Sequence, residues 1–542
     1  MFSSYWISRS ILQAIGTTIS YLSLKKNADI DWIEEIKKIE KLDDIINQKL
    51  KEINKKLENK PKIVSEIFAR LEKNKKSLSL ILKLFRFLRL VKKSDYKELK
   101  NLLQKKEMVE NLNGDLPNYK DIIHIVMLAD YKEGEKIIRP SIEAIKESNY
   151  PKDKIIVVLA NEERSREITK EYAERLKREY KNTFFEFLNT VHPDLPNEVK
   201  AKGANFLFAS KEVKKFLDER NIDYKNVLIS AFDGDTRPHK EYFGKLTHDY
   251  ILSKNRLKKS FQPNPLYFNN IWDTTWFCRA ISFGTSFWSM TRSGLFDEFL
   301  FTYSGHSTSF ESALKNGLWS ADCINEDSKQ GFKAFLNEKG EHKVIPLSIP
   351  IFMDSVFSGS LKDTIKNQYK QLQRWAYGAE HIPYMLTRFF KEKDLQTRKI
   401  FFRIMSYLLD NVFWASSTFS IMITSWIPTI ISKNISNTAF GFNYYRYIFL
   451  GMWIFGFISL FGNFIFSILL SKKFIKNLKI KPLQILYSAI LQWLFYPVIL
   501  FVFYGTTGLD SMTRLMLGKY LTYWTTVKKV KEENKLNQPV NY

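Results

Sequence analysis

The chain has 542 residues, of which 45% are hydrophobic and 15% aromatic, so it is long enough for two or three domains and a sizeable core. Its two cysteines, Cys278 and Cys323, exclude a disulfide framework and the usual four-ligand zinc site. The formal charge of +25 favours either nucleic acid or an anionic membrane surface as a partner.

The position of the basic residues distinguishes these two partners. Lysine and arginine are dense at 386–403 and at 471–481, and both segments flank strongly apolar stretches. Basic residues beside apolar spans are typical of the cytoplasmic side of a membrane protein. We therefore expect a membrane lipid partner and no nucleic acid.

The first segment, 1–116, is expected to be a helical and partly amphipathic extension. Residues 1–24 place aromatic and apolar side chains at near-helical spacing, which predicts an interfacial helix rather than a signal peptide or a span. Residues 31–60 carry one apolar stripe, which predicts a helix packed on its own domain or paired as a short coiled coil. Residues 78–93 predict a basic amphipathic helix, either on a membrane surface or buried with a basic edge.

From about residue 117 the pattern changes to short apolar runs that alternate with helical stretches. We expect strands at 122–128, 154–159, 184–188 and 226–232, with helices at 164–180 and 201–217 between them. Such alternation predicts an α/β domain, 117–403, with a largely parallel sheet. Ligands of these sheets bind at the carboxyl ends of the strands.

The last segment, 404–542, is expected to hold transmembrane helices and a basic tail. Three apolar runs are each near the ~20 residues that cross a bilayer: 412–431, 447–470 and 483–504. The charge distribution places the α/β domain in the cytosol, on the inner face of the plasma membrane. The tail at 527–535 is also basic, so either 505–524 returns across the membrane or the third run is re-entrant; both remain open.

Asp233-Gly234-Asp235 follows the last predicted strand. Two carboxylates separated by one residue can bind one hard cation, Mg²⁺ or Mn²⁺, together with substrate phosphates. The glycine between them would let the backbone approach a diphosphate. The alternative is an ordinary turn, which Asp-Gly pairs favour.

Asn325-Glu326-Asp327 is a second acidic motif. A carboxylate here could act as the general base that takes a proton from an acceptor hydroxyl. The alternative is an acidic cluster at a helix N-terminus, which the helix dipole favours.

Gln371-Leu372-Gln373-Arg374-Trp375 lies in a polar, predicted helical stretch. Arg374 could bind a diphosphate through paired hydrogen bonds, and Trp375 could offer an aromatic face to a sugar. The alternative is an amphipathic helix on the membrane surface with an aromatic anchor. A further segment, 304–310, is rich in hydroxyl groups and contains His306; we expect a loop that lines an acceptor cleft rather than a Ser/His hydrolase site.

Taken in order, these motifs resemble the membrane-integrated family-2 glycosyltransferases, such as cellulose, chitin and hyaluronan synthases, over about residues 118–530. The resemblance implies a GT-A fold, a divalent cation (Mg or Mn) and a UDP- or GDP-linked sugar donor. It implies Asp327 as the acceptor base, and Asp233 and Asp235 as the metal ligands. The other implied donor-binding residues are Tyr131, Glu133, Lys202 and Arg374, and the acceptor-binding residues are Glu326, Gln371 and Trp375.

The chain departs from the family pattern at three points. Ala160-Asn161-Glu162-Glu163 stands where the family has an acidic pair that reads uracil, so the base preference is open. Asn325 stands where a threonine is usual, and three spans are few for threading a polymer.

We therefore expect an inverting glycosyltransferase with a membrane-associated saccharide or lipid acceptor. Processive polysaccharide synthesis and transfer of a single sugar to a lipid carrier or glycolipid both remain open. The alternative outside enzymes is a membrane scaffold with a degenerate transferase domain.

Overall fold

The structure is a computed structural model that describes residues 2–57, 92–431, 434, 438–439, 450–475, 486 and 490–522. The chain divides into two compact units. The larger comprises Met1–Asp29, Ile122–Phe243 and Leu257–Tyr542, and the smaller comprises Ile30–Asp121 and Gly244–Arg256. The basic tail predicted at 527–535 and most of the helix predicted at 78–93 lie outside the described residues.

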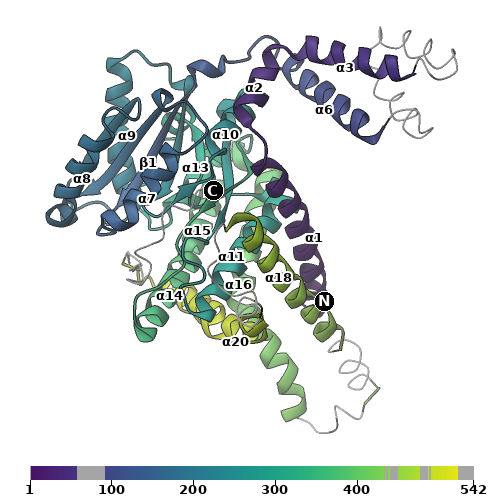
Figure 1. The fold of residues 1–542 in the computed structure, drawn as a ribbon. Helices are drawn as coiled ribbons and strands as arrows, with labels where there is room; N and C mark the ends of the chain where they lie inside the picture. Colours follow the sequence, from purple (N-terminus) through teal and green to yellow (C-terminus); the bar gives the residue numbers. More distant parts are fainter. Residues whose placement is uncertain are drawn as a thin grey trace. The chain divides into compact units, whose positions relative to one another are not determined.

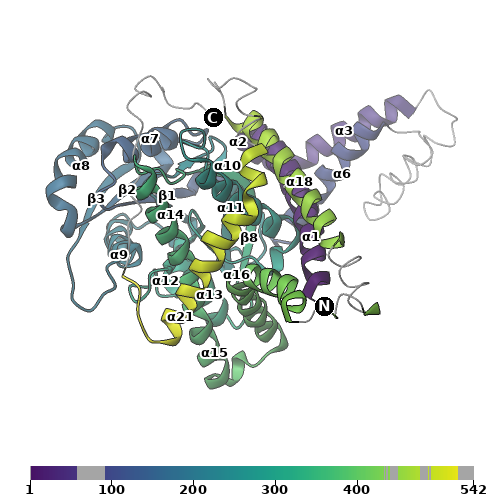
Figure 2. The same cartoon turned by 90° about the horizontal axis from the view of Figure 1, so that it is seen from below.

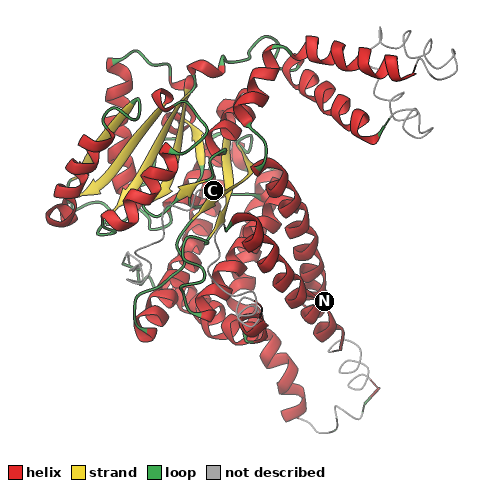
Figure 3. Cartoon of the chain, in the orientation of Figure 1, coloured by secondary structure: helices red, strands yellow, loops and turns green. Residues whose placement is uncertain are grey.

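An eight-stranded sheet forms the centre of the larger unit, in the order β3-β2-β1-β4-β7-β6-β8-β5. Figure 3 shows its strands in yellow among the helices. The strands β1, β2, β3 and β4 are parallel neighbours, β7 joins them in the antiparallel direction, and β6 pairs in parallel with β8. The strands are β1 Ile123–Asp130, β2 Ile155–Glu162, β3 Glu186–His192, β4 Val227–Asp233, β5 Arg237–Pro238, β6 Lys259–Leu266, β7 Ser307–Ser309 and β8 Lys343–Phe352.

The predicted α/β class, with its first four strands and two of its helices, is confirmed. The strands β1, β2 and β4 are apolar along almost their whole length because helices cover both faces of a parallel sheet. The helices α7 (Glu135–Lys146), α8 (Arg166–Tyr180) and α9 (Lys202–Glu219) lie beside these strands (Figure 1). Phe206 and Val213 of α9 pack with Ile125 and Ile229 of the sheet in one core.

The register of the sheet places two acidic residues at one edge. Ala129 of β1 pairs with Asp233 of β4, so Asp130 and Asp233 end neighbouring parallel strands. The chain crosses from β1 to β2 on one side and β4 lies on the other side, which is the arrangement that opens a crevice at the strand ends.

The remaining helices of the larger unit surround the second half of the sheet. The first of them, α1, lies side by side with α18 in both views (Figures 1 and 2). Gly16 of α1 permits a close contact with α11, since a Cβ there would lie 2.9 Å from the carbonyl oxygen of Thr291. The helices are α1 Phe2–Ala28, α11 Trp276–Leu295, α12 Phe310–Lys315, α13 Glu326–Asn337, α14 Leu361–Ala376, α15 His381–Lys391, α16 Arg398–Ile431, α18 Leu450–Phe474, α20 Tyr496–Ile499 and α21 Thr506–Met516, with a π-helical segment Leu500–Gly505 before α21.

The described parts of the apolar runs are largely helical. The runs at 412–431 and 447–470 overlap α16 and α18, and the run at 483–504 overlaps the helical stretch from residue 490. A helix with the length and hydropathy of a bilayer span is not found among the described residues. The transmembrane part of the predicted fold is therefore not confirmed.

The smaller unit is built from α2 (Trp32–Glu40), α3 (Leu42–Leu57), α6 (Lys93–Glu110) and most of α10 (Tyr242–Ile251). The single helix predicted at 31–60 is thus two helices, because the backbone leaves the helical conformation at Lys41. The apolar stripe packs within its own unit, with Ile46 and Leu50 of α3 against Leu99 of α6.

Candidate active site

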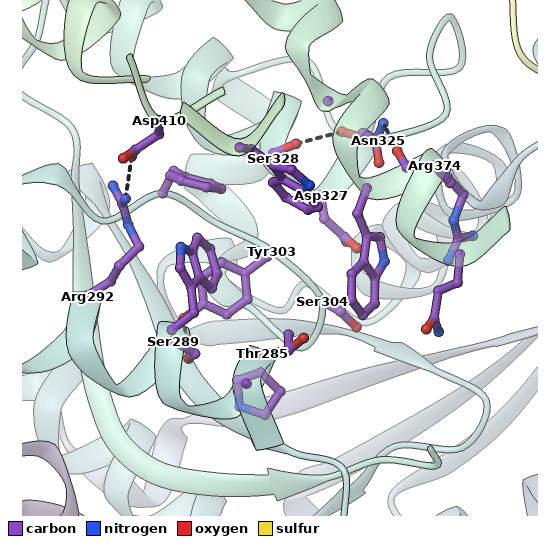
Figure 4. A pocket seen from close by; sticks show the side chains of 18 of the residues that line it. Thr285, Ser289, Arg292, Tyr303, Ser304, Asn325, Asp327, Ser328, Arg374 and Asp410 are labelled. Carbon is purple, nitrogen blue, oxygen red and sulfur yellow. Dashed lines mark hydrogen bonds and ion pairs between the residues drawn. The ribbon is translucent and has the colours of Figure 1, made fainter. Parts of the chain in front are cut away.

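A cavity of 740 Å³ opens at the carboxyl edge of the sheet, which is within the usual volume of ligand sites. All the predicted site residues except Tyr131 line it: Glu133, Lys202, Asp233, Asp235, Glu326, Asp327, Gln371, Arg374 and Trp375. Figure 4 shows Asp327 and Ser304 between Arg374 at one end of the cavity and Arg292 with Asp410 at the other. Residues distant in the sequence therefore meet in one space.

The Asp233-Gly234-Asp235 motif ends β4 beside β1. A Cβ on Gly234 would lie 2.7 Å from the carbonyl oxygen of Ala129 and 2.7 Å from Cδ1 of Ile138. The glycine is therefore required by the packing of the strand end against β1 and α7. The packing alone explains why position 234 is a glycine. The expected close approach of a diphosphate is therefore not needed as a reason.

The two aspartates of this motif have different surroundings. Asp233 accepts hydrogen bonds from Nζ of Lys202 at 2.8 Å and from Oγ of Ser304 at 2.6 Å, and its side chain is 32% exposed. Asp235 is buried, and its carboxylate accepts the backbone N–H of Asp354 at 2.7 Å. Asp233 is thus the more accessible of the two carboxylates.

The acidic side chains of this site suit a divalent cation that arrives with a phosphate ligand. Within the described residues, no group of three or more His, Cys, Asp or Glu side chains is arranged to hold a metal by itself. Two carboxylates on one cavity wall nevertheless fit Mg²⁺ or Mn²⁺, which is commonly bound by one or two carboxylates with phosphate and water completing the shell. Asp233 and Asp235 are the residues that would hold it.

Lys202, at the start of α9, joins the two acidic motifs. Its ammonium lies 2.8 Å from Asp233, 3.1 Å from Glu326 and 2.7 Å from Asp327. Burial alone would lower the pKa of Lys202, but the three carboxylates raise it well above the ordinary lysine value, so the side chain is charged. The lysine compensates the charge of carboxylates that come from β4 and α13.

The glycine after Lys202 explains how α9 reaches α13. A Cβ on Gly203 would lie 2.2 Å from the carbonyl oxygen of Ser320 and 2.8 Å from Cβ of Glu326. Only glycine fits this contact, which brings the ammonium of Lys202 to the carboxylates of Glu326 and Asp327.

Glu326 and Asp327 lie in the first turn of α13. They thus form an acidic cluster at a helix N-terminus, which was the alternative interpretation of this motif. Glu326 is 3% exposed, and burial raises its pKa to about 7 although Lys202 opposes the shift. Asp327 lies 3.6 Å from Nδ1 of His306, and its backbone carbonyl accepts the hydroxyl of Thr302 at 2.6 Å. Asp327 is thus held at the cavity wall from several directions.

The Gln-x-x-Arg-Trp motif lies in α14, as predicted, and faces the same cavity. Nδ2 of Asn325 donates to the backbone carbonyl of Arg374 at 3.0 Å, which fastens the start of α13 to α14. The Trp375 ring lies 6.2 Å from the ring of Tyr267. Asn325, a departure from the family pattern, therefore has a structural role that positions Asp327 relative to Arg374.

Of the predicted donor-binding residues Tyr131 and Glu133, only Glu133 faces the cavity. Tyr131 does not line the cavity; its ring lies 4.6 Å from the guanidinium of Arg164, which also pairs with Glu162. Glu133 does line the cavity and accepts the backbone N–H of Tyr131. Burial, with the nearby Asp130, raises the pKa of Glu133 well above its ordinary value.

Several residues of the site were not predicted from the sequence. The segment expected as a loop at 304–310 contains β7, and its hydroxyl groups are buried in the sheet; only Ser304 reaches the cavity. His306 is buried beside Asp327. Trp288 and Arg292 of α11 also line the cavity, and no local pattern marks them.

The chain matches no protein-family model and no curated protein. Among solved structures it is similar to S. aureus TarS 1–349, at 12% identity and a TM-score of 0.33, covering 54% of this chain and 74% of that chain. It is also similar to GalNAc-T7 with UDP, GalNAc and Mn²⁺ (10% identity, TM-score 0.31, 44% of each chain).

A third similar structure is the mannosyltransferase PcManGT from Pyrobaculum calidifontis in complex with GDP-Man and Mn²⁺, at 10% identity and a TM-score of 0.36, covering 82% of this chain and 98% of that chain. Likenesses this distant carry no argument about the activity of this chain. The function proposed next therefore rests on the residues of the cavity.

Proposed function

We propose that this chain is an inverting glycosyltransferase that moves a sugar from a UDP- or GDP-linked donor to a hydroxyl group of a saccharide or lipid acceptor. One observation carries the proposal. Lys202 holds carboxylates of two distant acidic motifs, Asp233 and Asp327, on the wall of a cavity that Arg374 and Trp375 also line.

In this mechanism Asp327 is the general base. Its carboxylate takes the proton of the acceptor hydroxyl, and the acceptor oxygen attacks the anomeric carbon from the face opposite the nucleotide. A new carbon–oxygen bond forms as the bond from the anomeric carbon to the diphosphate breaks, so the configuration inverts. Lys202 and the backbone contact from Thr302 keep the base in place during this step.

The leaving diphosphate needs positive charge that is already in position. Arg374 supplies a planar guanidinium on the cavity wall, and Lys202 supplies an ammonium between the two acidic motifs. A divalent cation at Asp233 and Asp235, when bound with the donor, would neutralise further charge on the departing phosphates. Gln371, Glu326 and Trp375 would contact the acceptor sugar.

The test uses membranes from cells that express the full chain, incubated with labelled UDP- and GDP-sugars and with MnCl₂ or EDTA. We expect label from one donor to enter lipid or polymer only with the cation. Asp327→Asn should lower transfer at least about 100-fold, because general base catalysis contributes roughly 10²–10⁴-fold.

The matched control is Asp322→Asn, because Asp322 is 71% exposed and pairs with Lys329 outside the cavity. An Asp327→Asn enzyme with full transfer activity would contradict the assignment of the base. Failure of the wild-type protein to turn over any nucleotide sugar would instead support a scaffold with a degenerate domain. Product length separates single transfer from polymer synthesis.

We also propose that the chain is an integral protein of the inner (plasma) membrane with the catalytic unit in the cytosol. The support is the density of basic residues at 386–403 and 471–481 beside apolar runs. Resistance of the full chain to alkaline carbonate extraction would agree with this proposal, and release into the supernatant would refute it.

A further inference from the structure

The cavity extends well beyond the residues assigned to the donor and the base. Its far end is lined by Trp288 and Arg292 of α11 and by Asp410 and Trp414 of α16. Figure 4 shows Arg292 and Asp410 facing each other at this end, with Tyr303 between them and Asp327. We call this part of the cavity, lined by Trp288, Arg292, Tyr303 and Asp410, the aromatic arm.

The segment 301–304 connects the aromatic arm to the base. Thr302 and Ser304 point to the reaction centre, donating to the Asp327 carbonyl and the Asp233 carboxylate, each at 2.6 Å. The intervening Tyr303 turns the other way, and its ring lies 5.5 Å from that of Trp288. Alternation of this kind is what an extended chain produces. The arm therefore begins next to the groups that hold Asp327 and Asp233.

The aromatic arm combines apolar faces with one compensated ion pair. Arg292 donates to Asp410 at 2.5 Å and to the backbone carbonyl of Phe299 at 2.8 Å. Its guanidinium lies 5.6 Å from the Trp288 ring centroid and 5.1 Å from that of Phe301. Arg292 is almost buried, whereas the Asp410 side chain is 27% exposed. The pair thus offers both donors and acceptors while its charges cancel.

The chemistry of the arm selects among ligands. A sugar ring has apolar C–H faces that pack on aromatic rings and hydroxyl groups that both donate and accept hydrogen bonds. A phosphate head group would find the charge of Arg292 already compensated by Asp410, so the arm supplies no net positive charge for it. A bare alkyl chain would displace water from the ion pair without replacing its hydrogen bonds, which is costly. A neutral saccharide fits best.

We propose that the aromatic arm binds a neutral sugar unit of the acceptor, so that the enzyme extends an acceptor that already carries sugar. The inference rests on the proposed function and deepens it by naming the acceptor class. Trp288 provides the platform for the sugar ring, and the Arg292–Asp410 pair binds its hydroxyl groups. The transferred sugar joins the hydroxyl at Asp327 while the preceding sugar unit occupies the arm.

The experiment uses the purified full chain in lipid nanodiscs and a ladder of neutral oligosaccharides, one to six units long, from the gluco-, manno- and N-acetylglucosamine series. Saturation-transfer NMR reports which sugars bind, and the same samples are assayed for transfer from the active nucleotide sugar. We expect a sharp gain in affinity between one unit and two or three units, because the second unit reaches the arm.

The variants distinguish loss of acceptor binding in the aromatic arm from a general loss of folding or activity. Trp288→Ala should raise the acceptor KM by about tenfold or more, and by more than it changes the donor KM. The control is Trp276→Ala, on the same helix but 43% exposed and outside the cavity lining. Asp410→Asn should have the same effect as Trp288→Ala. If the Trp288→Ala chain does not fold, Trp288→Phe, which keeps an aromatic face, should show a smaller acceptor effect at an unchanged melting temperature.

The outcomes distinguish the two levels of inference. Binding of no nucleotide sugar by the wild-type chain overturns the proposed function itself. Donor turnover without binding of any oligosaccharide, or activation by a polyprenyl phosphate alone, overturns only the aromatic arm as a saccharide site. Equal acceptor KM for the wild type and both Trp288 variants also overturns it.

Discussion

At the residue scale the site depends on Lys202. Three carboxylates lie within 3.1 Å of its ammonium, so the net charge of this small cluster is negative even with the lysine charged. Carboxylates this close repel one another in a partly dry cavity, and the lysine is the group that allows them to share it. An anionic diphosphate beside this negative cluster would therefore need the divalent cation as well as the ammonium of Lys202. In the proposed mechanism the lysine thus serves both the base and the leaving group.

Lys202→Met should lower kcat/KM for the donor at least about 100-fold, because fixed positive charge at a reacting anion is typically worth 10²–10³-fold. The pKa of Glu326, already about 7 through burial, should rise further without the opposing lysine. Kinetics in membranes measure the effect. The control is Lys200→Met, since Lys200 is 55% exposed and pairs with Asp194 away from the cluster. Full activity in Lys202→Met would show that the cluster is not catalytic.

Glu380 provides a test that does not depend on activity. Burial raises its pKa to about 7, with the Tyr520 hydroxyl at 3.3 Å opposing the shift. The folded state therefore binds the Glu380 proton more tightly than the unfolded state, so this group contributes stability at acid pH that is lost as pH rises from about 4.5 to 7. Glu380→Gln, which resembles the protonated form, should remove this loss, which for a pKa raised from 4.5 to about 7 is on the order of 3 kcal/mol.

The measurement for Glu380 is the melting temperature of the purified chain between pH 5 and pH 8 in matched buffers. Glu219→Gln, at the exposed end of α9, is the control and should keep the wild-type pH profile. An unchanged profile in Glu380→Gln would mean that the carboxyl titrates normally.

At the scale of elements, the site depends on the contact between α9 and α13. Gly203 permits it, since any side chain there would collide with the Ser320 carbonyl and with Glu326. The two helices carry the lysine and the acids, so their spacing sets the geometry of the cluster. A change in this contact should lower the transfer activity even though Gly203 itself bears no functional group.

Gly203→Ala should therefore lower both stability and activity. Overpacking of this kind costs about 1–3 kcal/mol, which exceeds the gain in helix propensity of about 1 kcal/mol. Gly462→Ala is the matched control, because a Cβ at this helical position meets nothing within 4 Å and should be neutral or stabilising. Thermal unfolding and transfer assays on both variants decide the question. Equal melting temperatures would contradict the collision.

For the whole molecule, the sequence predicted the parts that follow from local pattern. Three of the four parallel strands, β1, β2 and β4, are continuous apolar runs because both faces of the sheet are covered, so they were visible without a structure. Asp233 was marked by its place at the end of a predicted strand, and Gln371 and Arg374 by their place in a predicted helical stretch. That these groups share one site was implied by the order of the motifs and the family resemblance, and not by local pattern.

The rest depends on contacts between distant segments. The strand β7 is polar, and its hydroxyl groups are satisfied inside the sheet, Ser307 by Ser230 and Tyr242 at 2.7 Å each. A serine-rich run gives no strand signal, so a loop was predicted. Arg292 and Asp410 stand 118 residues apart and pair only when α11 meets α16. Tyr131 was assigned by resemblance, and its ring lies beside the guanidinium of Arg164 and outside the lining of the cavity.

For the whole chain, binding of the nucleotide and the cation should raise the stability of the folded state. A ligand that binds only the folded state stabilises it by about 2.7 kcal/mol at a hundredfold excess over its Kd. UDP or GDP together with Mn²⁺ should therefore raise the melting temperature of the purified chain, and EDTA should abolish the rise. Asp235→Asn should remove most of this rise, because the amide oxygen can still accept the backbone N–H of Asp354 while the charge for the cation is lost.

The control for Asp235→Asn is Asp218→Asn on the exposed face of α9, where the aspartate pairs with Lys214. A rise of equal size in Asp235→Asn, or one that persists in EDTA, would show that the nucleotide binds without a cation at this motif.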